Sequence, residues 1–418
     1  MDNNTRILAE QNPPLTDHEA LVESNRCLYC YDAPCTHACP THIDIPRFIK
    51  KISTANVVGS ARTILESNLI GATCARVCPV EELCEGACVL NSEHKPIRIA
   101  RLQRYAMDHV YDRHIDVFQP VPATGRSVAV IGAGPAGLSC AGELARRGHA
   151  VTIFEKRDLS GGLSTYGIIV LREPVPVALA EVEMIARLGV KFVTGTEVSE
   201  PITGYDAVFV ATGLGATPSL GIPGEELILD GLAFIERSKM NPDDLHPGEK
   251  VVVIGAGNTA IDCATVAKRS GASRVTMVYR RTERDMSAYP HEYEFVKKEG
   301  VEFEFLTKPV AAHTEGLECI RGSSTFLIPA DTIVKAIGQQ RPSIASVLGL
   351  ETDRGFIKVS GTLETSVPGI YAGGDCIRAR GSASTVMAAQ DGKIAAQAIH
   401  QKLVAPTVFA VGVSHSTK

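Results

Sequence analysis

The sequence has no long apolar run, since no stretch approaches the roughly 18 consecutive apolar residues that a membrane-spanning helix needs. Residues Met1 to Leu15 are polar and contain proline, unlike a secretory signal peptide. There is no block of lysine or arginine, and the net charge is −5, so the sequence lacks the basic footprint of a protein that binds nucleic acid or an anionic membrane. We therefore expect a cytoplasmic protein with no membrane and no nucleic-acid partner.

Cysteine pairs at redox spacing are missing from the last two thirds of the chain. The cysteines there are single ones: Cys140, Cys263, Cys319 and Cys376. A flavoprotein that reduces disulfides would need a pair beside the flavin, so this class is disfavoured. The remaining eight of the twelve cysteines lie between Cys27 and Cys88. In a chain without an export signal, such clustering favours metal ligation over disulfides.

The stretch Val128 to Glu155 predicts a dinucleotide-binding βαβ unit. A short apolar strand runs into glycines at the G-x-G-x-x-G positions, and a helix and a second strand ending at an acidic residue follow. Glycine permits the tight turn, the close approach to a pyrophosphate and the close helix packing, and the free N–H groups of the helix N-terminus attract the phosphates. The carboxylate would accept hydrogen bonds from a ribose. The residues of the turn are Gly132, Gly134, Pro135, Ala136 and Gly137, and the acid is Glu155.

From Lys250 onward the chain repeats this pattern. The turn carries Gly255, Gly257 and Ala260, but the second strand of the unit ends in Arg280 and Arg281 instead of an acid. Two such units imply two dinucleotides. Arginine at this point commonly meets the 2′-phosphate of NADPH, although the two arginines could equally be solvent-exposed charges at the end of a strand.

A third stretch, Gly369 to Asp375, predicts a strand that ends in Gly-Gly-Asp, and an alanine-rich helix is expected from Ser382 to Gln401. Asp375 could bond a ribityl hydroxyl, and the N-terminus of the helix could face the pyrimidine edge of a flavin. The alternative is an aspartate that only caps a turn.

The clustered cysteines form two groups. The first is a C-x2-C-x4-C-x3-C-P run from Cys27 to Pro40, similar to the run of bacterial ferredoxins, and the second extends from Cys74 to Cys88. Thiolates at these spacings suit iron–sulfur clusters or zinc, and the Cys-Pro pairs favour iron–sulfur. Eight cysteines would fill two four-iron clusters, but spacing does not assign them to one cluster or the other.

Together these motifs resemble the two-nucleotide flavoproteins that carry an N-terminal pair of iron–sulfur clusters. This group includes the small subunit of bacterial glutamate synthase and the flavin subunits of bacterial NAD-dependent dihydropyrimidine dehydrogenases, and the resemblance covers roughly Cys27 to Ile399. It is carried by CARVCPVEELCEGAC from Cys74, by Pro96 to Gln103, by GGLST from Gly161 and by GAGNTAIDCA from Gly255.

The resemblance implies a ligand set for each cluster that cysteine counting alone does not. One cluster would be held by Cys27, Cys30, Cys35 and Cys88. The other would be held by Cys39, Cys78, Cys84 and Gln103. Cys74 would then not be a cluster ligand.

The resemblance also implies FAD contacts at Glu155, Leu163, Arg172, Gly374 and Asp375. Nicotinamide contacts would come from Gly257, Asn258, Thr259, Arg280, Arg281, Ala336, Ile337 and Gly338. Ser287 stands where NADPH-dependent relatives have a further basic residue, although Arg284 is nearby, so NADH is favoured over NADPH.

We therefore expect an α/β protein with two Rossmann-like domains, preceded by an α-helical domain with two [4Fe-4S] clusters. The expected limits are 1–120 for the helical iron–sulfur domain, 121–215 with 339–418 for the FAD domain, and 216–338 for the NAD(P)H domain. The family implies an electron-input subunit that oxidises NADH through FAD. Its partner in a hetero-oligomer, a heterotetramer in the expected form, would carry FMN and further clusters and reduce uracil or thymine.

Three alternatives remain open at this point. The chain could be a glutamate synthase small subunit, which uses nearly the same electron-input design. It could be a stand-alone NADH:acceptor oxidoreductase. From a different class, the cysteine region could be a zinc-bound docking module on a nucleotide-sensing protein.

Overall fold

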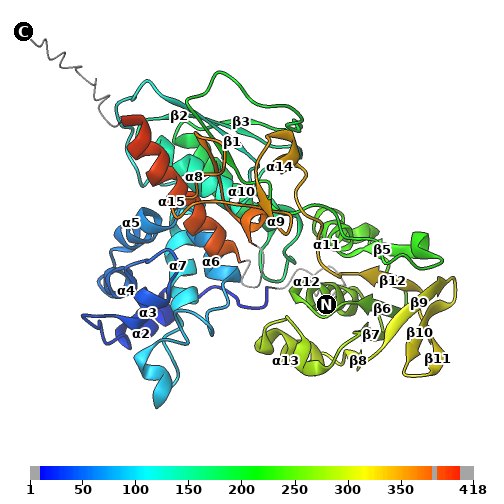
Figure 1. Cartoon of the computed structure of the whole chain (residues 1–418). Helices are drawn as coiled ribbons and strands as arrows, with labels where there is room; N and C mark the ends of the chain where they lie inside the picture. Colours follow the sequence, from blue (N-terminus) through cyan, green and yellow to red (C-terminus); the bar gives the residue numbers. More distant parts are fainter. Residues whose placement is uncertain (1–9, 379–383, 405–418) are drawn as a thin grey trace, which may run out of the picture.

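The computed structural model describes residues 10–378 and 384–404, so the predicted helix start at Ser382 lies outside the described residues. A helical N-terminal region lies beside two α/β folds, each built on its own sheet (Figure 1). Within the described ranges, no helix combines the length and the apolarity needed to cross a membrane.

The N-terminal region is a set of short helices around one core that includes Phe48, Ile64 and Leu102. Side chains cap several of these helices, among them Thr16, which forms a capping box with Glu19. The helices are α2 Asp17–Asn25, α3 Pro34–Ala38, α4 Ile45–Ser53, α5 Val57–Ser67, α6 Gly71–Val77, the 3-10 helix η1 Val89–Ser92 and α7 Ile99–Asp112. The region predicted to separate the two cysteine groups thus forms α4 and α5, which bring the groups together.

The first sheet is parallel and has the strand order β15-β4-β1-β2-β3. Its strands are β1 Ser127–Ile131, β2 Ala150–Phe154, β3 Lys191–Val193, β4 Ala207–Val210 and β15 Ile370–Ala372. Its helices are α8 Pro135–Ala145, α9 Leu163–Tyr166, α10 Val175–Arg187 and α15 Thr385–Val404. The strand order reverses at β1, and ligands of open α/β sheets bind beyond the carboxyl ends of strands at such a point.

Helix α15 crosses α8 at very short range. A Cβ atom on Gly392 would lie 2.3 Å from the carbonyl oxygen of Ala136, so only glycine fits the crossing. Ser139 of α8 donates a hydrogen bond to the carbonyl of Ala389, at 2.7 Å. The C-terminal helix is therefore fixed against the helix that begins at the first glycine turn.

The second sheet repeats this design with the order β5-β12-β6-β7-β8, again all parallel. Its strands are β5 Ile228–Asp230, β6 Lys250–Ile254, β7 Arg274–Val278, β8 Glu302–Glu304 and β12 Thr332–Lys335. The helices beside it are α11 Gly231–Met240, α12 Asn258–Arg269 and α13 Pro290–Lys298. The two sheets with the helical region confirm the expected fold class, while the exact domain limits remain a prediction.

A three-stranded antiparallel sheet is inserted between β8 and β12, and the glycine and strand motifs give no signal for it. It consists of β9 Lys308–His313, β10 Gly316–Arg321 and β11 Ser324–Pro329. In Figure 1 it lies at the far end of the molecule from the helical N-terminal region. The remaining short elements include α14 Ile344–Val347, β13 Thr352–Asp353 and β14 Phe356–Ile357.

Candidate functional site

The first glycine turn has the geometry of a phosphate cradle. Gly132 has a φ of 100°, and a Cβ on Gly137 would lie only 2.0 Å from the carbonyl oxygen of Gly132. The nearest atom to a Cβ on Gly134 would be in Gly162, at 4.0 Å, so there is room for a ligand to approach the backbone at Gly134. No side chain caps α8, which leaves its first N–H groups facing this opening. The turn therefore fits a pyrophosphate group.

Glu155, at the end of β2, is buried and stabilises the same turn. Its carboxylate accepts hydrogen bonds from the backbone N–H of Ala133, at 2.8 Å, and of Arg157, at 2.9 Å. A carboxylate has further lone pairs, so these bonds leave acceptor capacity for a ribose. The ribose contact itself stays a prediction.

The Gly-Gly-Asp stretch after β15 lies directly against this turn. A Cβ on Gly374 would lie 3.1 Å from the Cβ of Ala136. The N–H of Gly374 donates to Asp391 of α15, at 2.8 Å, and Arg378 forms an ion pair with the same carboxylate at 2.5 Å. Burial raises the pKa of Asp375, while the nearby Arg378 opposes that rise. Segments more than 200 residues apart in the sequence thus meet at one predicted flavin pocket.

The second glycine turn has the same geometry with one addition. A Cβ on Gly255 would lie 2.2 Å from the carbonyl oxygen of Ala336, which joins the turn to the end of β12. The side chain of Asn258 accepts a hydrogen bond from the N–H of Tyr289, at 3.1 Å. A Cβ on Gly257 would lie 3.2 Å from the hydroxyl of Ser287. A segment that ends at α13 therefore lies close over the second turn.

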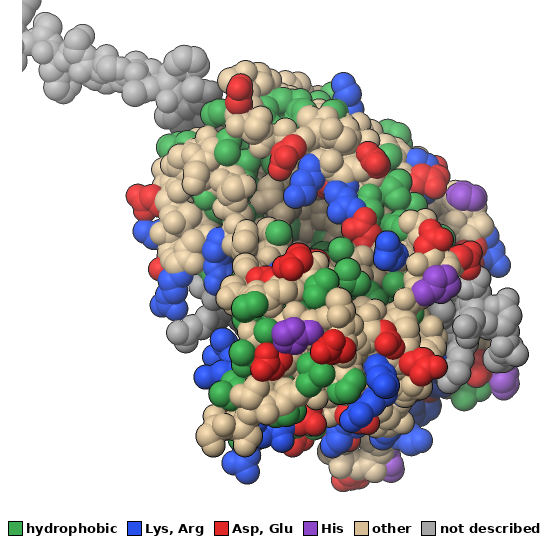
Figure 2. Space-filling view, turned by 90° about the vertical axis from the view of Figure 1, so that its right-hand side faces the viewer, with side chains coloured by type: hydrophobic (Ala, Val, Ile, Leu, Met, Phe, Trp, Pro, Cys, Tyr) green, Lys and Arg blue, Asp and Glu red, His purple; other side chains and the backbone are tan. Residues whose placement is uncertain are grey.

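The remaining predicted nicotinamide residues lie around this turn. Arg280 and Arg281 follow β7 and are exposed, as is Arg284. Thr259 is in the first turn of α12, and Ile337 and Gly338 follow β12. In Figure 2, which views the molecule from the right-hand side of Figure 1, a hollow lies near the middle of the face with both basic and acidic side chains beside it.

Two predicted FAD residues have surroundings that the sequence does not reveal. Leu163 begins α9 and is partly exposed. Arg172 forms ion pairs with Asp262 of α12 and with Glu292 of α13, the latter at 2.5 Å. These pairs tie the segment before α10 to the second α/β fold. A direct contact between Arg172 and FAD stays a prediction.

The cysteines surround two separate cavities, each with roughly 360 to 380 Å³ of atom-free space that includes the open mouth. We call them the outer and the inner cavity. The outer cavity is lined by Cys27, Cys30, Cys35 and Cys88, with apolar side chains such as Leu28, Val89 and Ile49 between them. Burial raises the pKa of Cys27, and burial with the neighbouring thiols raises that of Cys35 to about 12. Thiols so placed need the positive charge of bound metal to exist as thiolates.

The inner cavity is lined by Cys39, Cys74, Cys78, Cys84 and Gln103, and also by Val386 of α15. The Nε2 group of Gln103 donates to the carbonyl of Gly71 at 2.7 Å, which orients the side chain and leaves Oε1 as an acceptor. A hydrogen bond with Cys74 and burial raise the pKa of Cys78 well above its usual value. Five possible ligands therefore share this cavity, and Cys74 is one of them.

The arrangement of the cysteines fits iron–sulfur clusters better than zinc. The thiols are spread around the walls of the two cavities, as the ligands of a polynuclear cluster are. Among the described residues, no group of three or more Cys, His, Asp or Glu side chains is placed to hold a single metal ion.

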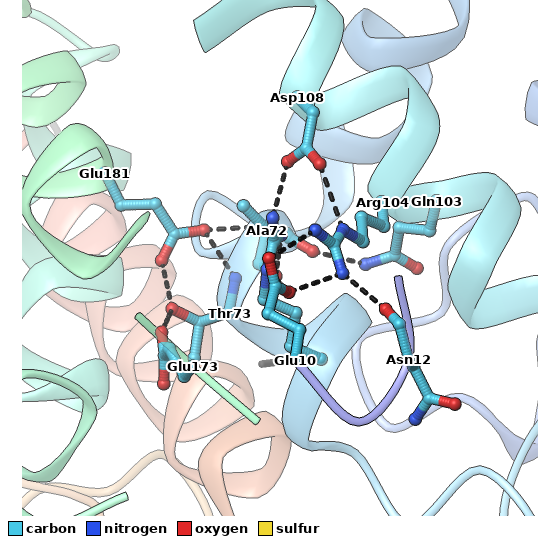
Figure 3. A network of polar contacts seen from close by, with 11 residues as sticks. Glu10, Asn12, Ala72, Thr73, Gln103, Arg104, Asp108, Glu173 and Glu181 are labelled. Atoms are coloured by element: carbon cyan, nitrogen blue, oxygen red, sulfur yellow. Dashed lines mark hydrogen bonds and ion pairs between the residues drawn. The ribbon is translucent and has the colours of Figure 1, made fainter. Parts of the chain in front are cut away.

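A buried polar network lies beside the inner cavity (Figure 3). No sequence motif predicts this network. Glu181 of α10 accepts hydrogen bonds from the N–H groups of Ala72 and Thr73, at 2.7 and 3.1 Å, at the beginning of α6. The hydroxyl of Thr73 contacts Glu181 at 2.6 Å and Glu173 at still closer range. Burial raises the pKa of Glu173 to about 7 and that of Glu181 to about 8.

Comparison with protein families shows two regions in this chain. A family model described as pyridine nucleotide-disulphide oxidoreductase matches residues 126–392. A second, described as dihydropyrimidine dehydrogenase domain II, 4Fe-4S cluster, matches residues 4–115. The first points to FAD and NAD(P), and the second points to a 4Fe-4S cluster.

Curated relatives match over nearly the whole length. NAD-dependent dihydropyrimidine dehydrogenase subunit PreT of Escherichia coli (strain K12) is 35% identical over 404 residues, covering 95% of this chain and 97% of the relative. The NADPH glutamate synthase small chain of the same strain is 31% identical over 439 residues, covering 92% of each. Among solved structures, Thermoplasma acidophilum thioredoxin reductase has a TM-score of 0.57 at 23% identity, covering 66% of this chain and 99% of that one, which shows the shared fold.

Proposed function

Because the chain belongs to the family of iron–sulfur flavoprotein oxidoreductases that includes PreT and the glutamate synthase small chain, we propose that it is the electron-input subunit of a dihydropyrimidine dehydrogenase. In this role it oxidises NADH and passes single electrons to a partner subunit. The observation that carries the proposal is the order of its sites. Helix α15 reaches from the predicted flavin pocket to the inner cavity, and Ile45 lines both the inner and the outer cavity.

Helix α15 connects the first two of these sites. It is anchored beside the flavin turn through Asp391 and Gly392, and its residue Val386 lines the inner cavity. The outer cavity is lined by two exposed apolar side chains, Leu28 and Val89, and the exposed Tyr31 directly follows Cys30, another residue of the lining. An apolar rim beside a redox centre suits a protein partner that accepts electrons.

We assign FAD to the first glycine turn and NADH to the second. The assigned FAD contacts are Gly132, Gly134, Pro135, Ala136, Gly137, Glu155, Leu163, Arg172, Gly374 and Asp375. The assigned nicotinamide contacts are Gly255, Gly257, Asn258, Thr259, Arg280, Arg281, Ala336, Ile337 and Gly338. When bound, NADH supplies a hydride, and FAD converts this two-electron donor into single electrons that the clusters can carry. The task of the residues is to position the two rings and to exclude water, so no acid or base is required.

We assign one [4Fe-4S] cluster to each cavity. The ligands are Cys27, Cys30, Cys35 and Cys88 in the outer cavity. They are Cys39, Cys78, Cys84 and Gln103 in the inner cavity. The hydrogen bond from Gln103 to Gly71 supports this choice, because it uses the nitrogen of the side-chain amide and leaves the amide oxygen free to act as a ligand.

The partner in this proposal carries FMN and further clusters and reduces uracil or thymine to the 5,6-dihydro form in a heterotetramer with this chain. Two parallel sheets with their helices, two small antiparallel sheets and one helical region account for the described residues, and no separate barrel for a pyrimidine is among them. The second candidate is a glutamate synthase small chain, which the relative with 92% mutual coverage supports. Co-purification with a pyrimidine-reducing or a glutaminase-type chain distinguishes the two.

The experiment that tests the proposal is an assay of the purified chain with and without that partner. The chain alone should oxidise NADH with an artificial acceptor and should fail to reduce uracil. Uracil reduction should appear when the partner is added. Physiological turnover without any partner would instead support a stand-alone oxidoreductase.

The nucleotide preference has its own test. Ser287 has a neutral hydroxyl at the position where NADPH-dependent relatives have a further basic residue to hold the 2′-phosphate. The kcat/KM should therefore be higher for NADH than for NADPH. A strong preference for NADPH would overturn this assignment and would point to Arg280 and Arg281 as the phosphate site.

A further inference from the structure

Lys393 joins the flavin fold to the inner cysteine cavity. It lies on α15, and its Nζ donates hydrogen bonds to the carbonyl oxygens of Thr41, at 3.0 Å, and Ser67, at 3.1 Å. Thr41 belongs to the turn that follows Cys39, and Ser67 is the last residue of α5. One ammonium group therefore holds two segments of the helical region against the C-terminal helix.

This ammonium group lies close to a predicted cluster ligand. The thiol of Cys39 and the hydroxyl of Thr41 are 3.4 Å apart, and Val386, two turns earlier on α15, lines the same cavity as Cys39. Lys393 follows Gly392, which packs against Ala136 of the first glycine turn, so one short stretch of α15 contacts both the flavin turn and the turn that carries Cys39.

Lys393 has no carboxylate partner among the described residues. The carboxylate that acts on it from α8, Glu143, forms ion pairs with Arg146 at 3.1 Å and Arg147 at 2.5 Å. Burial lowers the pKa of Lys393, the two arginines act in the same direction, and Glu143 and a Cys39 thiolate oppose them. A buried cation without a paired anion is costly unless a charge in its surroundings compensates it.

We propose that Lys393 is the counter-charge of the cluster in the inner cavity and that it raises the reduction potential of that cluster. A cluster held by thiolates is anionic and becomes more so on reduction, and the net charge near it is one of the factors that set its potential. A fixed positive charge on the flavin side therefore makes the inner cavity a better acceptor of electrons that leave the flavin. This inference rests on the proposed presence of a cluster in that cavity.

The test is a potentiometric titration of the purified chain, followed by EPR, with three substitutions at one position. Lys393→Met removes both the charge and the hydrogen bonds, Lys393→Gln keeps a hydrogen-bond donor without the charge, and Lys393→Arg keeps the charge. Lys402→Met is the matched control. Lys402 is on the same helix, but it is half exposed and pairs with Glu364 at 2.6 Å.

The Gln variant should reduce the inner cluster with an equilibrium constant about tenfold lower than that of the parent chain, which for a one-electron couple is about 59 mV. The Met variant should show at least the same shift. The Arg variant and Lys402→Met should stay near the parent, and the outer cluster should change little in all four. A loss of the inner cluster in both the Met and the Gln variants that Lys393→Arg does not show would also support the proposal, because it would make the charge a requirement for cluster retention.

The proposal is overturned if the Gln variant binds both clusters with parental potentials, or if Lys402→Met produces the same shift. Failure of the underlying functional assignment would look different. In that case the parent chain itself would contain no cluster ligated by Cys39, Cys78 and Cys84, as iron analysis of the parent and of Cys84→Ser would show.

Discussion

The two cysteine cavities are built from the same kind of ligand but are held in different ways. The outer cavity is formed within the helical region and is lined by exposed Leu28 and Val89, and exposed Tyr31 directly follows Cys30 in the chain. The inner cavity is enclosed by contacts that cross between regions: Val386 from α15, Lys393 on the Cys39 turn, and Glu181 on the N-terminus of α6. In the proposed function, the outer cavity would therefore face the partner subunit, and the inner cavity would receive electrons from the flavin.

If each cavity holds a cluster as proposed, burial and fixed charges would act on the inner cluster and solvent exposure on the outer one, which would make the two redox centres differ. Four sets of substitutions test this difference between the two cavities.

The largest expected effect comes from removing one cluster at a time. Cys30→Ser should remove the outer cluster and leave about four of about eight irons per chain. NADH oxidation with an artificial acceptor that takes electrons from the flavin should continue, while electron transfer to the partner should fall to background. The measurement is iron content together with both assays. Undiminished transfer to the partner would contradict the outer position of this cavity.

The next change distinguishes the two candidate ligands in the inner cavity. Gln103→Ala should remove the oxygen ligand and reduce the iron content from about eight to about four per chain, whereas Cys74→Ser should leave about eight. Both variants should keep the outer cluster, so its EPR signal is the internal control. If Cys74→Ser loses four irons and Gln103→Ala loses none, the ligand set is wrong.

A smaller effect is expected from the pH dependence of the contact between α6 and α10. The Thr73 hydroxyl has one hydrogen but lies within hydrogen-bond distance of two carboxyl groups, so it can donate to only one of them, and a proton shared by Glu173 and Glu181 satisfies the other contact. Burial is the main cause of both raised pKa values. Lys239, Arg76 and Arg172 oppose the rise at Glu173, and hydrogen bonds from Thr73 and Ala72 oppose it at Glu181. The folded chain thus binds the shared proton more tightly than the unfolded chain.

Because these folded-state pKa values are raised from 4.5 to about 7 and 8, their contribution to stability is complete below about pH 4.5 and is lost as the pH rises through 7 to 8. Each proton contributes a slope of at most about 1.4 kcal/mol per pH unit. Glu173→Gln, whose amide can still donate to Thr73, should reduce this slope in denaturant unfolding of the holoprotein between pH 6 and about 8.5. An unchanged slope would contradict the shared proton.

The smallest expected effect concerns the rim of the outer cavity. Tyr31 is fully exposed, so Tyr31→Ser should not affect folding, but it should raise the KM for the partner about tenfold if its ring is buried on docking. Exposed Leu327 of β11, far from both cavities, provides the matched control as Leu327→Ser. Equal effects of the two substitutions would contradict the rim as the docking surface.

Much of this structure could be predicted from the sequence because the decisive signals are local. The glycine spacing at Gly132 and Gly255 requires a particular backbone, and both turns form as expected. The family resemblance grouped Cys88 with the first run, which spacing alone did not, and the structure places Cys88 in the outer cavity. The assignment of each side chain as a ligand stays a prediction.

The remaining features depend on contacts between distant segments, for which one sequence carries no periodic signal. Lys393 and Glu181 resemble any other charged residue of a helix, and only the packed structure shows what they touch. Helix α7 begins at Ile99, because the segment from Pro96 to Arg98 bonds to Glu23 and Arg26 instead of forming helical bonds. Tertiary contacts there decide the helix boundary.

The central claim is that electrons enter at the nicotinamide site and leave as single electrons through two clusters. The most direct test is anaerobic mixing of the purified holoprotein with NADH, followed by rapid freezing and EPR. The claim predicts two distinct reduced [4Fe-4S] signals that both develop on the timescale of turnover. Bleaching of the flavin by NADH while every iron centre stays oxidised would contradict it.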